Sequence, residues 1–182
     1  MKHPFICFLL GLLPVLGMAQ GLSWHSIGPE LQVYPTGIIP GLRAEWTSGE
    51  KSTVHLRIGA NLIDHRDLGV QDDETGSGYG FTLGYRRFFD TDYKRWFLGV
   101  RSDLWRNTID WKNAPGTLLE TSGTTEITVL QPTLEGGYSF ALSDHWSLAP
   151  TLAFGYEVNV VTDGAEVGQG PILLLGLHLA WR

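Results

Sequence analysis

The last twelve residues, 171–182, decide the fold, and they read Pro-Ile-Leu-Leu-Leu-Gly-Leu-His-Leu-Ala-Trp-Arg. Successive side chains of an extended strand point to opposite faces. One face of this stretch is therefore apolar throughout, with Leu173, Leu175, Leu177, Leu179 and Trp181. The other face is mixed, with Ile172, Leu174, Gly176, His178, Ala180 and Arg182. An apolar outside and a partly polar inside are typical of a strand in a transmembrane β-barrel.

Seven further extended segments precede this strand and alternate in the same way. All but the first are near or above the roughly 9 to 11 residues that a tilted strand needs to cross a membrane. The sequence therefore predicts an all-β fold, an eight-stranded antiparallel up-and-down transmembrane barrel. The predicted strands are residues 27–34, 38–47, 53–64, 79–89, 95–108, 126–142, 146–161 and 171–182.

The connections between these strands alternate in length. Short polar turns at 47–51, 90–94 and 143–145 follow the second, fourth and sixth strands. Longer connections follow the third, fifth and seventh strands, at 67–78, 113–123 and 162–170. Outer-membrane barrels place short turns in the periplasm and long loops outside. The short connection after the first strand, at 35–37, is the exception to this pattern.

The N-terminal residues read as a secretory signal. Lys2 is followed by an apolar stretch and by the small residues Gly17 and Ala19, which predicts a signal peptide over 1–19 and a barrel domain over 20–182. A helical anchor would need about 20 apolar residues, and Pro14 interrupts this stretch. The one cysteine, Cys7, lies in the predicted signal, so the mature chain is expected to form no disulfide.

Charge and tryptophan content restrict the function further. The chain has 13 Lys and Arg against 19 Asp and Glu, a net charge of −6, which argues against nucleic acid as a partner. Tryptophans lie at the strand ends next to the short turns, as in the aromatic girdle of a membrane barrel. We assign Trp46, Trp96, Trp146 and Trp181 to this girdle, and we expect Tyr34, Tyr79, Trp111 and Tyr156 to form a second ring nearer the longer loops.

The inward positions carry glycines and ionisable residues. Four arginines and five carboxylates share this face, and an isolated charge there would cost several kcal/mol. Glycines such as Gly80 and Gly84 leave room, because an eight-stranded barrel is only just wide enough for its own side chains. We therefore predict an interior plugged by ion pairs, with the polar network Glu30, Arg43, Glu45, His55, Arg57, Arg86, Arg101, Asp103, Glu135, Glu157 and His178.

The pattern resembles the small eight-stranded outer-membrane barrels, such as the OmpA transmembrane domain and OmpX, over essentially the whole mature chain. The resemblance implies an integral protein of the outer membrane of a Gram-negative bacterium. It also implies contact with outer-membrane lipids and with the outer-membrane assembly machinery during biogenesis.

Some small barrels are enzymes that modify lipids, so serines and histidines are the candidate catalytic residues. His145-Trp146-Ser147 is the nearest match to the His-x-Ser of lipid A deacylases, but it falls at a predicted periplasmic turn. His25-Ser26 precedes the first strand without an evident carboxylate partner. A short motif without its context specifies little chemistry. We predict no catalytic residue and no cofactor, with a lipid A- or phospholipid-modifying enzyme as the alternative.

One connection is rich in possible ligands for a hard cation: His65, Asp67, Asp72, Asp73 and Glu74. Oxygen ligands suit Ca²⁺ and Mg²⁺, but the spacing is not that of an EF-hand, and a solvated loop is favoured. We predict a non-enzymatic barrel with a structural or surface-interaction role through its loops. A soluble lipocalin-like carrier, which would need an apolar interior, is a further alternative.

Overall fold

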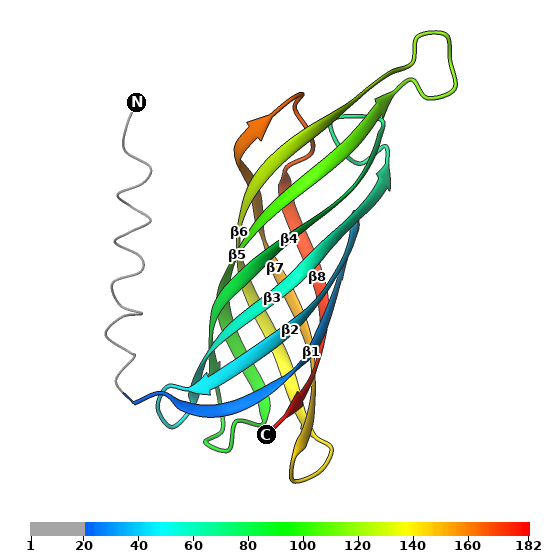
Figure 1. Ribbon diagram of the computed structural model, residues 1–182. Helices are drawn as coiled ribbons and strands as arrows, with labels where there is room; N and C mark the ends of the chain where they lie inside the picture. Colours follow the sequence, from blue (N-terminus) through cyan, green and yellow to red (C-terminus); the bar gives the residue numbers. More distant parts are fainter. Residues whose placement is uncertain (1–20) are drawn as a thin grey trace, which may run out of the picture.

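The computed structural model describes residues 21–182 (Figure 1). Eight antiparallel strands form one closed barrel in sequence order, so the predicted fold class is confirmed. The strands are β1 Ser23–Tyr34, β2 Gly37–Thr47, β3 Ser52–Arg66, β4 Asp73–Phe88, β5 Arg95–Asn113, β6 Thr121–Ala141, β7 Trp146–Asp163 and β8 Gly170–Trp181. Residues 21–182 include no helix long and apolar enough to span a membrane. The predicted signal peptide, 1–19, lies outside the described residues.

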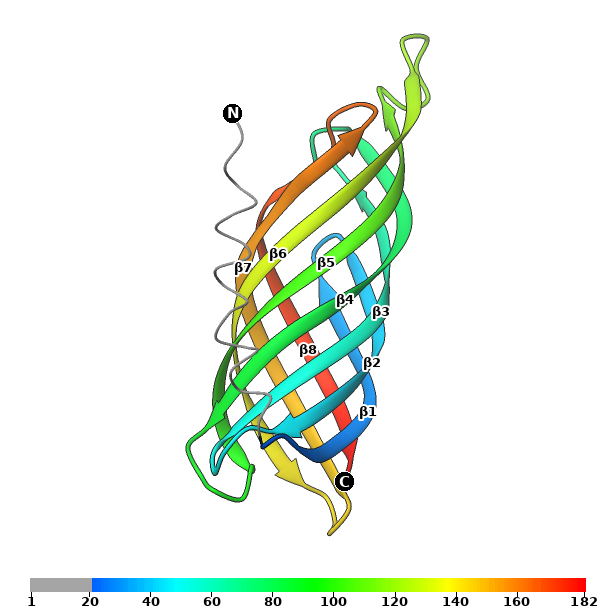
Figure 2. The ribbon, with the colours of Figure 1, turned by 60° about the vertical axis from the view of Figure 1, so that its left-hand side comes forward.

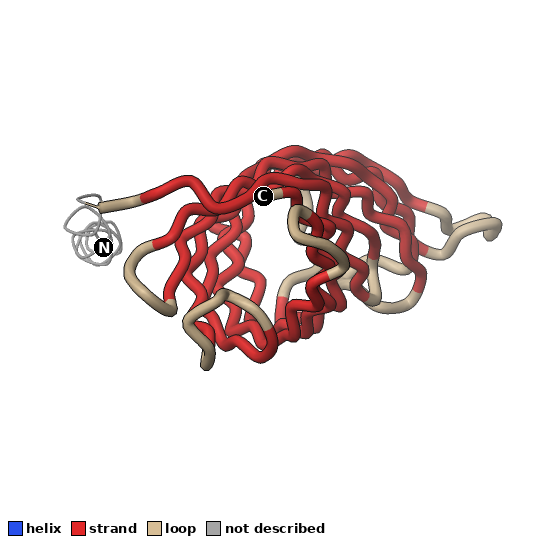
Figure 3. The backbone as a smooth tube through the Cα atoms, turned by 90° about the horizontal axis from the view of Figure 1, so that it is seen from below, coloured by secondary structure: helices blue, strands red, loops and turns tan. Residues whose placement is uncertain are grey.

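The first and last strands close the barrel. In the antiparallel pairing of β1 with β8, Ile27 lies opposite Trp181, Leu31 opposite Leu177 and Val33 opposite Leu175. Seen along the barrel, the strands form a single ring (Figure 3). Closure leaves neither lateral edge of the sheet open to lipid, where unpaired backbone groups would be costly.

The two ends of the barrel differ in their connections. The turn end carries the C-terminus and the connections 48–51, 89–94 and 142–145 (Figure 1). Gly49 has a φ of 104° in the first of these turns, a conformation that favours glycine. The loop end carries the connections 35–36, 67–72, 114–120 and 164–169.

Strands β4, β5 and β6 are longer at the loop end than the sequence suggested. The predicted connections 67–78 and 113–123 were too long, because β4 already begins at Asp73 and β6 at Thr121. Asp73 pairs with Lys112, and Trp111 pairs with Gly123. Polar side chains there hid the strand signal, since both faces of a strand outside the membrane can be polar.

The alternation of β8 holds in three dimensions. Leu173, Leu175 and Leu177 are 47%, 55% and 47% exposed, whereas the inward Leu174 and His178 are 1% and 2% exposed. The outward apolar positions predicted on the other strands are also exposed or partly exposed. The barrel therefore presents an apolar outer surface and buries its ionisable groups in its interior, here called the lumen.

Candidate functional site

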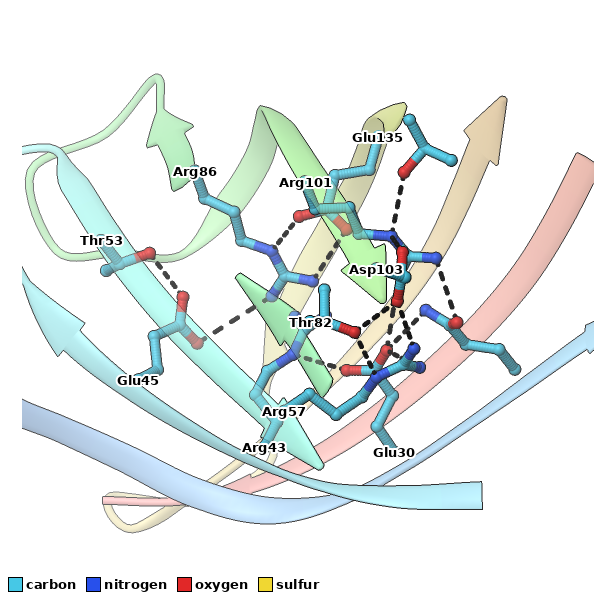
Figure 4. A network of polar contacts seen from close by, with 12 residues as sticks. Glu30, Arg43, Glu45, Thr53, Arg57, Thr82, Arg86, Arg101, Asp103 and Glu135 are labelled. Atoms are coloured by element: carbon cyan, nitrogen blue, oxygen red, sulfur yellow. Dashed lines mark hydrogen bonds and ion pairs between the residues drawn. The ribbon is translucent and has the colours of Figure 1, made fainter. Parts of the chain in front are cut away.

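Glu30 of β1 is the centre of the polar contacts in the lumen. Its carboxylate lies 2.5 Å from Arg43 Nε, 3.2 Å from Arg57 Nη1 and 3.7 Å from Arg101 Nη1. The three arginines project from β2, β3 and β5, and Figure 4 shows them converging from different sides of the barrel. One buried carboxylate is thus surrounded by three cations, an arrangement that is stable only when further anions balance them.

Asp103 of β5 supplies part of that balance. Its Oδ1 lies 2.7 Å from Arg57 Nη2, and its Oδ2 lies 3.4 Å from Arg101 Nε. The Thr82 hydroxyl donates a hydrogen bond to the same carboxylate, and Arg57 Nε donates to Thr82 Oγ1 at 3.0 Å. Arg57 therefore bridges two carboxylates across the lumen, and Trp105 lies against its guanidinium, with the ring centroid 5.4 Å away.

A second group of ion pairs lies nearer the turn end. Arg86 of β4 donates from Nε to Glu135 Oε1 at 2.6 Å, and its Nη1 lies 3.9 Å from Glu45 Oε2. Thr53 Oγ1 donates to Glu45 at 2.5 Å. The guanidinium also stacks on Phe97, with 4.4 Å to the ring centroid. Arginine suits this position because its planar group pairs with carboxylates and stacks on aromatic rings.

These eight ionised residues form what we call the central charged layer. It holds four arginines and four carboxylates, all buried: Glu30, Arg43, Glu45, Arg57, Arg86, Arg101, Asp103 and Glu135. The layer is therefore neutral as a whole. Sequence reasoning missed four neutral residues that hydrogen-bond to the layer, although the same inward alternation could have found them: Gln32, Thr53, Thr82 and Thr133.

The remaining predicted members of the polar network lie beside this layer or away from it. His55 and His178 are buried in the lumen, each 2% exposed. Gly84 makes room for His55, because a Cβ at this position would lie 2.3 Å from the imidazole. Glu157 is only partly buried and lies at the loop end, in a cavity with Glu74. The structure thus separates Glu157 from the ion pairs with which it was grouped.

The part of the lumen nearer the loops holds a cluster of buried apolar residues, which the prediction of a polar interior did not include. We call this region the loop-side apolar layer, and its members are Ile39, Ile63, Trp105, Ile109, Ile127, Val129, Ala153, Val167, Ile172 and Leu174. At the turn end, a smaller cluster of Phe88, Phe97 and Ala149 packs with Tyr93. The charged layer is therefore enclosed between two apolar ones.

The aromatic residues divide between the outer surface and the lumen. Trp96, Trp146 and Trp181 are 62%, 43% and 47% exposed at the turn end, and Trp46 is partly exposed. Trp24, which the girdle assignment omitted, packs edge-on against Trp46, with 5.8 Å between the two ring centroids.

The second ring predicted nearer the loops is only half present. Tyr79 and Tyr156 are exposed on the outer surface. In contrast, Tyr34 and Trp111 pack against the loop-side apolar layer inside the barrel. Tyr34 donates a hydrogen bond to Asn61, and Trp111 donates one to Thr125. Their inward positions on β1 and β5 follow from the alternation of those strands, which the ring assignment overlooked.

The residues considered as cation ligands do not form one cluster. Asp72 accepts a hydrogen bond from Ala114 N, and Asp73 lies 3.8 Å from Arg66 Nε. Glu74 is buried and accepts from Gln71 N and Gly168 N, while His65 Nε2 lies 3.3 Å from it. Within 21–182, no group of three or more His, Cys, Asp or Glu side chains is arranged to hold a metal ion.

The serines considered as nucleophiles are buried at the turn end. Ser147 is 5% exposed, whereas His145 of the same motif is exposed at the turn. Ser26 is 1% exposed, and its hydroxyl has no hydrogen-bond partner among the described residues. Both serines line a cavity of about 10 Å³ that also touches His25, Glu45 and His178, a volume that holds about one water molecule.

These features define a class: an eight-stranded membrane β-barrel with an apolar outer surface and buried ion pairs in its lumen. A family model described as "Protein of unknown function (DUF3575)" matches residues 32–163, and the chain belongs to this family. A comparison with curated proteins finds no match.

One solved outer-membrane barrel shares the fold, and two others match over most of their length. Neisserial surface protein A has a TM-score of 0.56 and 12% identity, over 90% of this chain and 99% of that one. The N-terminal barrel of Pseudomonas aeruginosa OprF has a TM-score of 0.49 and 13% identity, over 85% and 95% of the two chains. Ail of Yersinia pestis has a TM-score of 0.48 and 12% identity, with the same coverage. The predicted resemblance to small eight-stranded outer-membrane barrels is confirmed.

Proposed function

We propose that the protein is a non-enzymatic integral barrel of the outer membrane of a Gram-negative bacterium, exported by the signal at 1–19. We propose further that its lumen is plugged and that it acts through its loop end. The observation that carries the proposal is the central charged layer, where Arg57 links Glu30 to Asp103 and Arg86 links Glu45 to Glu135.

The charged layer supports a closed lumen for an energetic reason. A conducting pore keeps its lining ions hydrated, whereas these side chains are withdrawn from solvent and paired with one another. Opening a water path would separate pairs such as Arg57 and Asp103, which lie 2.7 Å apart. Trp105 and the other loop-side apolar residues cover the layer on one side, and Phe97 covers it on the other.

The loop end supports a role in surface contacts. Leu118 and Leu119, in the connection between β5 and β6, are 106% and 81% exposed, and Leu68 and Val70 are exposed in the connection after β3. Figure 1 shows the 114–120 connection extending furthest from the barrel. Exposed apolar residues that gather at one end of a molecule mark contact sites more often than scattered ones do.

Fractionation and conductance test the location and the plug. The protein should be found with the outer membrane and should need detergent for release; recovery in the soluble periplasm would refute the proposal. In planar bilayers the purified barrel should give no large, steady conductance, and such a conductance would refute the plugged lumen.

Serine substitutions test the absence of catalysis. Ser147→Ala and Ser26→Ala should leave the acylation pattern of lipid A and phospholipids unchanged in mass spectra of cells that express each variant. If expression of the wild type changes the acylation pattern and expression of either variant does not, the lipid-modifying enzyme would be favoured.

A further inference from the structure

At the loop end, the hairpin of β1 and β2 is shorter than the strands on either side of it. This hairpin turns at 35–36, whereas the neighbouring β3 continues to Arg66 and β8 begins at Gly170. The pairing of β2 with β3 stops at Gly37 and Ile63, and the last pair between β1 and β8 joins Val33 to Leu175. Figure 2 shows the blue hairpin ending well below the tops of its neighbours. The loop end thus has a lateral notch above this hairpin.

A cavity of about 310 Å³ lies at the notch. Tyr34, Pro35 and Thr36 of the hairpin line it, together with residues from five other strands and from the connections 67–72 and 164–169. Three members of the loop-side apolar layer, Ile63, Ile109 and Ile172, also line it. Its volume is at the lower end of the range found for small-molecule sites, about 300 to 1,000 Å³.

The lining of this cavity includes two carboxylic acids, one histidine and the Tyr34 phenol, but no cationic side chain of the lysine or arginine type. The acids are Glu74 and Glu157, and the histidine is His65. Glu74 is already occupied, because Gln71 N and Gly168 N donate to it and His65 Nε2 lies 3.3 Å away. The Glu157 carboxylate accepts no hydrogen bond and forms no ion pair within residues 21–182, although its backbone pairs with Gly170 of β8. The cavity therefore holds an acid without a counter-charge.

His65 provides a second acceptor without a partner. Its side chain is 5% exposed, and its Nδ1 makes no hydrogen bond within the described part of the chain. Because Nε2 faces the Glu74 carboxylate, the proton of the neutral ring belongs on Nε2, which leaves Nδ1 as an acceptor. A buried acceptor without a partner costs free energy that a donor from a ligand would recover.

We propose that this cavity binds a primary amine that carries a small apolar group. The ammonium would donate hydrogen bonds to Glu157 and to His65 Nδ1, and the apolar group would pack against Ile63, Ile109 and Ile172. A primary ammonium has the required N–H donors, whereas a quaternary ammonium has none. The site is separate from the central charged layer, and it does not depend on what the loop tips contact.

Calorimetric titration of the full barrel in phosphatidylcholine nanodiscs tests this site, with phenethylamine as the probe and empty nanodiscs as the blank. The amine should bind about tenfold tighter than 2-phenylethanol and than the N-trimethyl derivative of phenethylamine, because only the primary amine supplies both charge and donors. Equal affinity for the amine and the alcohol would overturn the proposal.

Two variants assign the binding to these residues. Glu157→Gln should weaken phenethylamine binding by about tenfold or more. His65→Phe, which keeps a ring of similar shape, should reduce the preference for the primary over the trimethylated amine. Glu126→Gln is the matched control, because Glu126 is an exposed carboxylate on β6. It should change neither the affinity for phenethylamine nor the preference for the primary amine. Unchanged binding by both test variants would contradict the assignment, and His65→Phe carries the test alone if Glu157→Gln fails to fold.

The same chemistry could come from a dissolved amine or from a lipid headgroup, because the notch opens sideways. Nanodiscs that contain phosphatidylethanolamine distinguish the two. Weaker phenethylamine binding to the wild type in these discs, with no such difference for Glu157→Gln, would identify the lipid amine as a competitor. Equal binding in both kinds of disc would assign the site to dissolved amines.

Discussion

The central charged layer and the loop-side apolar layer fill the same lumen with opposite chemistry. Both are buried, and they meet where the Arg57 guanidinium lies against Trp105. Ion pairs are specific, since each arginine must meet a carboxylate at hydrogen-bond distance, whereas apolar packing depends mainly on volume. The two layers should therefore respond differently to substitution: the charged layer to loss of a partner, and the apolar layer to loss of volume.

The largest effect is expected for Arg57→Met. This change leaves Glu30 and Asp103 without the cation that bridges them, and removal of one partner of a buried ion pair typically costs about 3–5 kcal/mol. We expect a fall of this size in the free energy of unfolding, measured by urea titration in phospholipid vesicles with tryptophan fluorescence. A loss below about 1 kcal/mol would mean that the layer behaves like a surface ion pair.

Leu174→Ala tests the apolar layer. Leu174 is 1% exposed, and truncation of a buried leucine costs about 2–5 kcal/mol through lost contacts and the cavity left behind. We expect the free energy of unfolding to fall by about 3 kcal/mol in the same titration. Leu175→Ala, the next residue on the lipid-facing side, is the control and should cost clearly less; equal losses would show that the lumen is loosely packed there.

Gly84→Ala tests how tightly the charged layer fits. The added Cβ would lie 2.3 Å from the His55 imidazole, and overpacking of this kind costs about 1–3 kcal/mol. Gly136→Ala is the control, since its Cβ would lie 3.3 Å from the end of the Leu98 side chain and 3.9 Å from the Phe97 carbonyl oxygen. Gly136→Ala should leave the urea midpoint of unfolding nearly unchanged. An equal shift of the midpoint for both variants would refute tight packing of the lumen.

The smallest effect is expected for Arg106→Met. Arg106 pairs with Glu126, but the two side chains are 56% and 49% exposed. Pairs of this kind contribute about 0–1 kcal/mol. The free energy of unfolding should change by no more than this, and added salt should reduce the difference further. A loss as large as that of Arg57→Met would remove the distinction between buried and exposed pairs.

Much of the lumen could be predicted from alternation alone. The inward positions of Arg43, Arg57 and Arg86 follow from counting by two along β2, β3 and β4. The pairing of these arginines could not be predicted, because it depends on which strands face each other across the lumen. Arg57 of β3 meets Asp103 of β5, and Arg86 of β4 meets Glu135 of β6, contacts that follow from the tilt and stagger of the strands.

Alternation along a strand also does not give the position of a residue along the barrel, and this explains the assignments that were wrong. Glu157 has the inward alternation of the other carboxylates, but β7 carries it to the loop end, where it lies beside Glu74 instead of an arginine. Trp111 was expected outside, and it packs inside because β5 extends to Asn113 without changing its alternation. The notch at 35–36 is visible in sequence only as a short connection, and its cavity also requires residues of β3, β4, β5, β7 and β8.

The sequence by itself determined the strand number, the closed antiparallel architecture and the face to which most side chains point. These properties depend on the period of two along each strand and on turn residues, both of which are local. Tertiary structure alone decided the division of the lumen into charged and apolar layers, the isolation of Glu157 and the notch. Those properties depend on the height of each side chain along the barrel, which is set only when all eight strands pair in register and the ring closes.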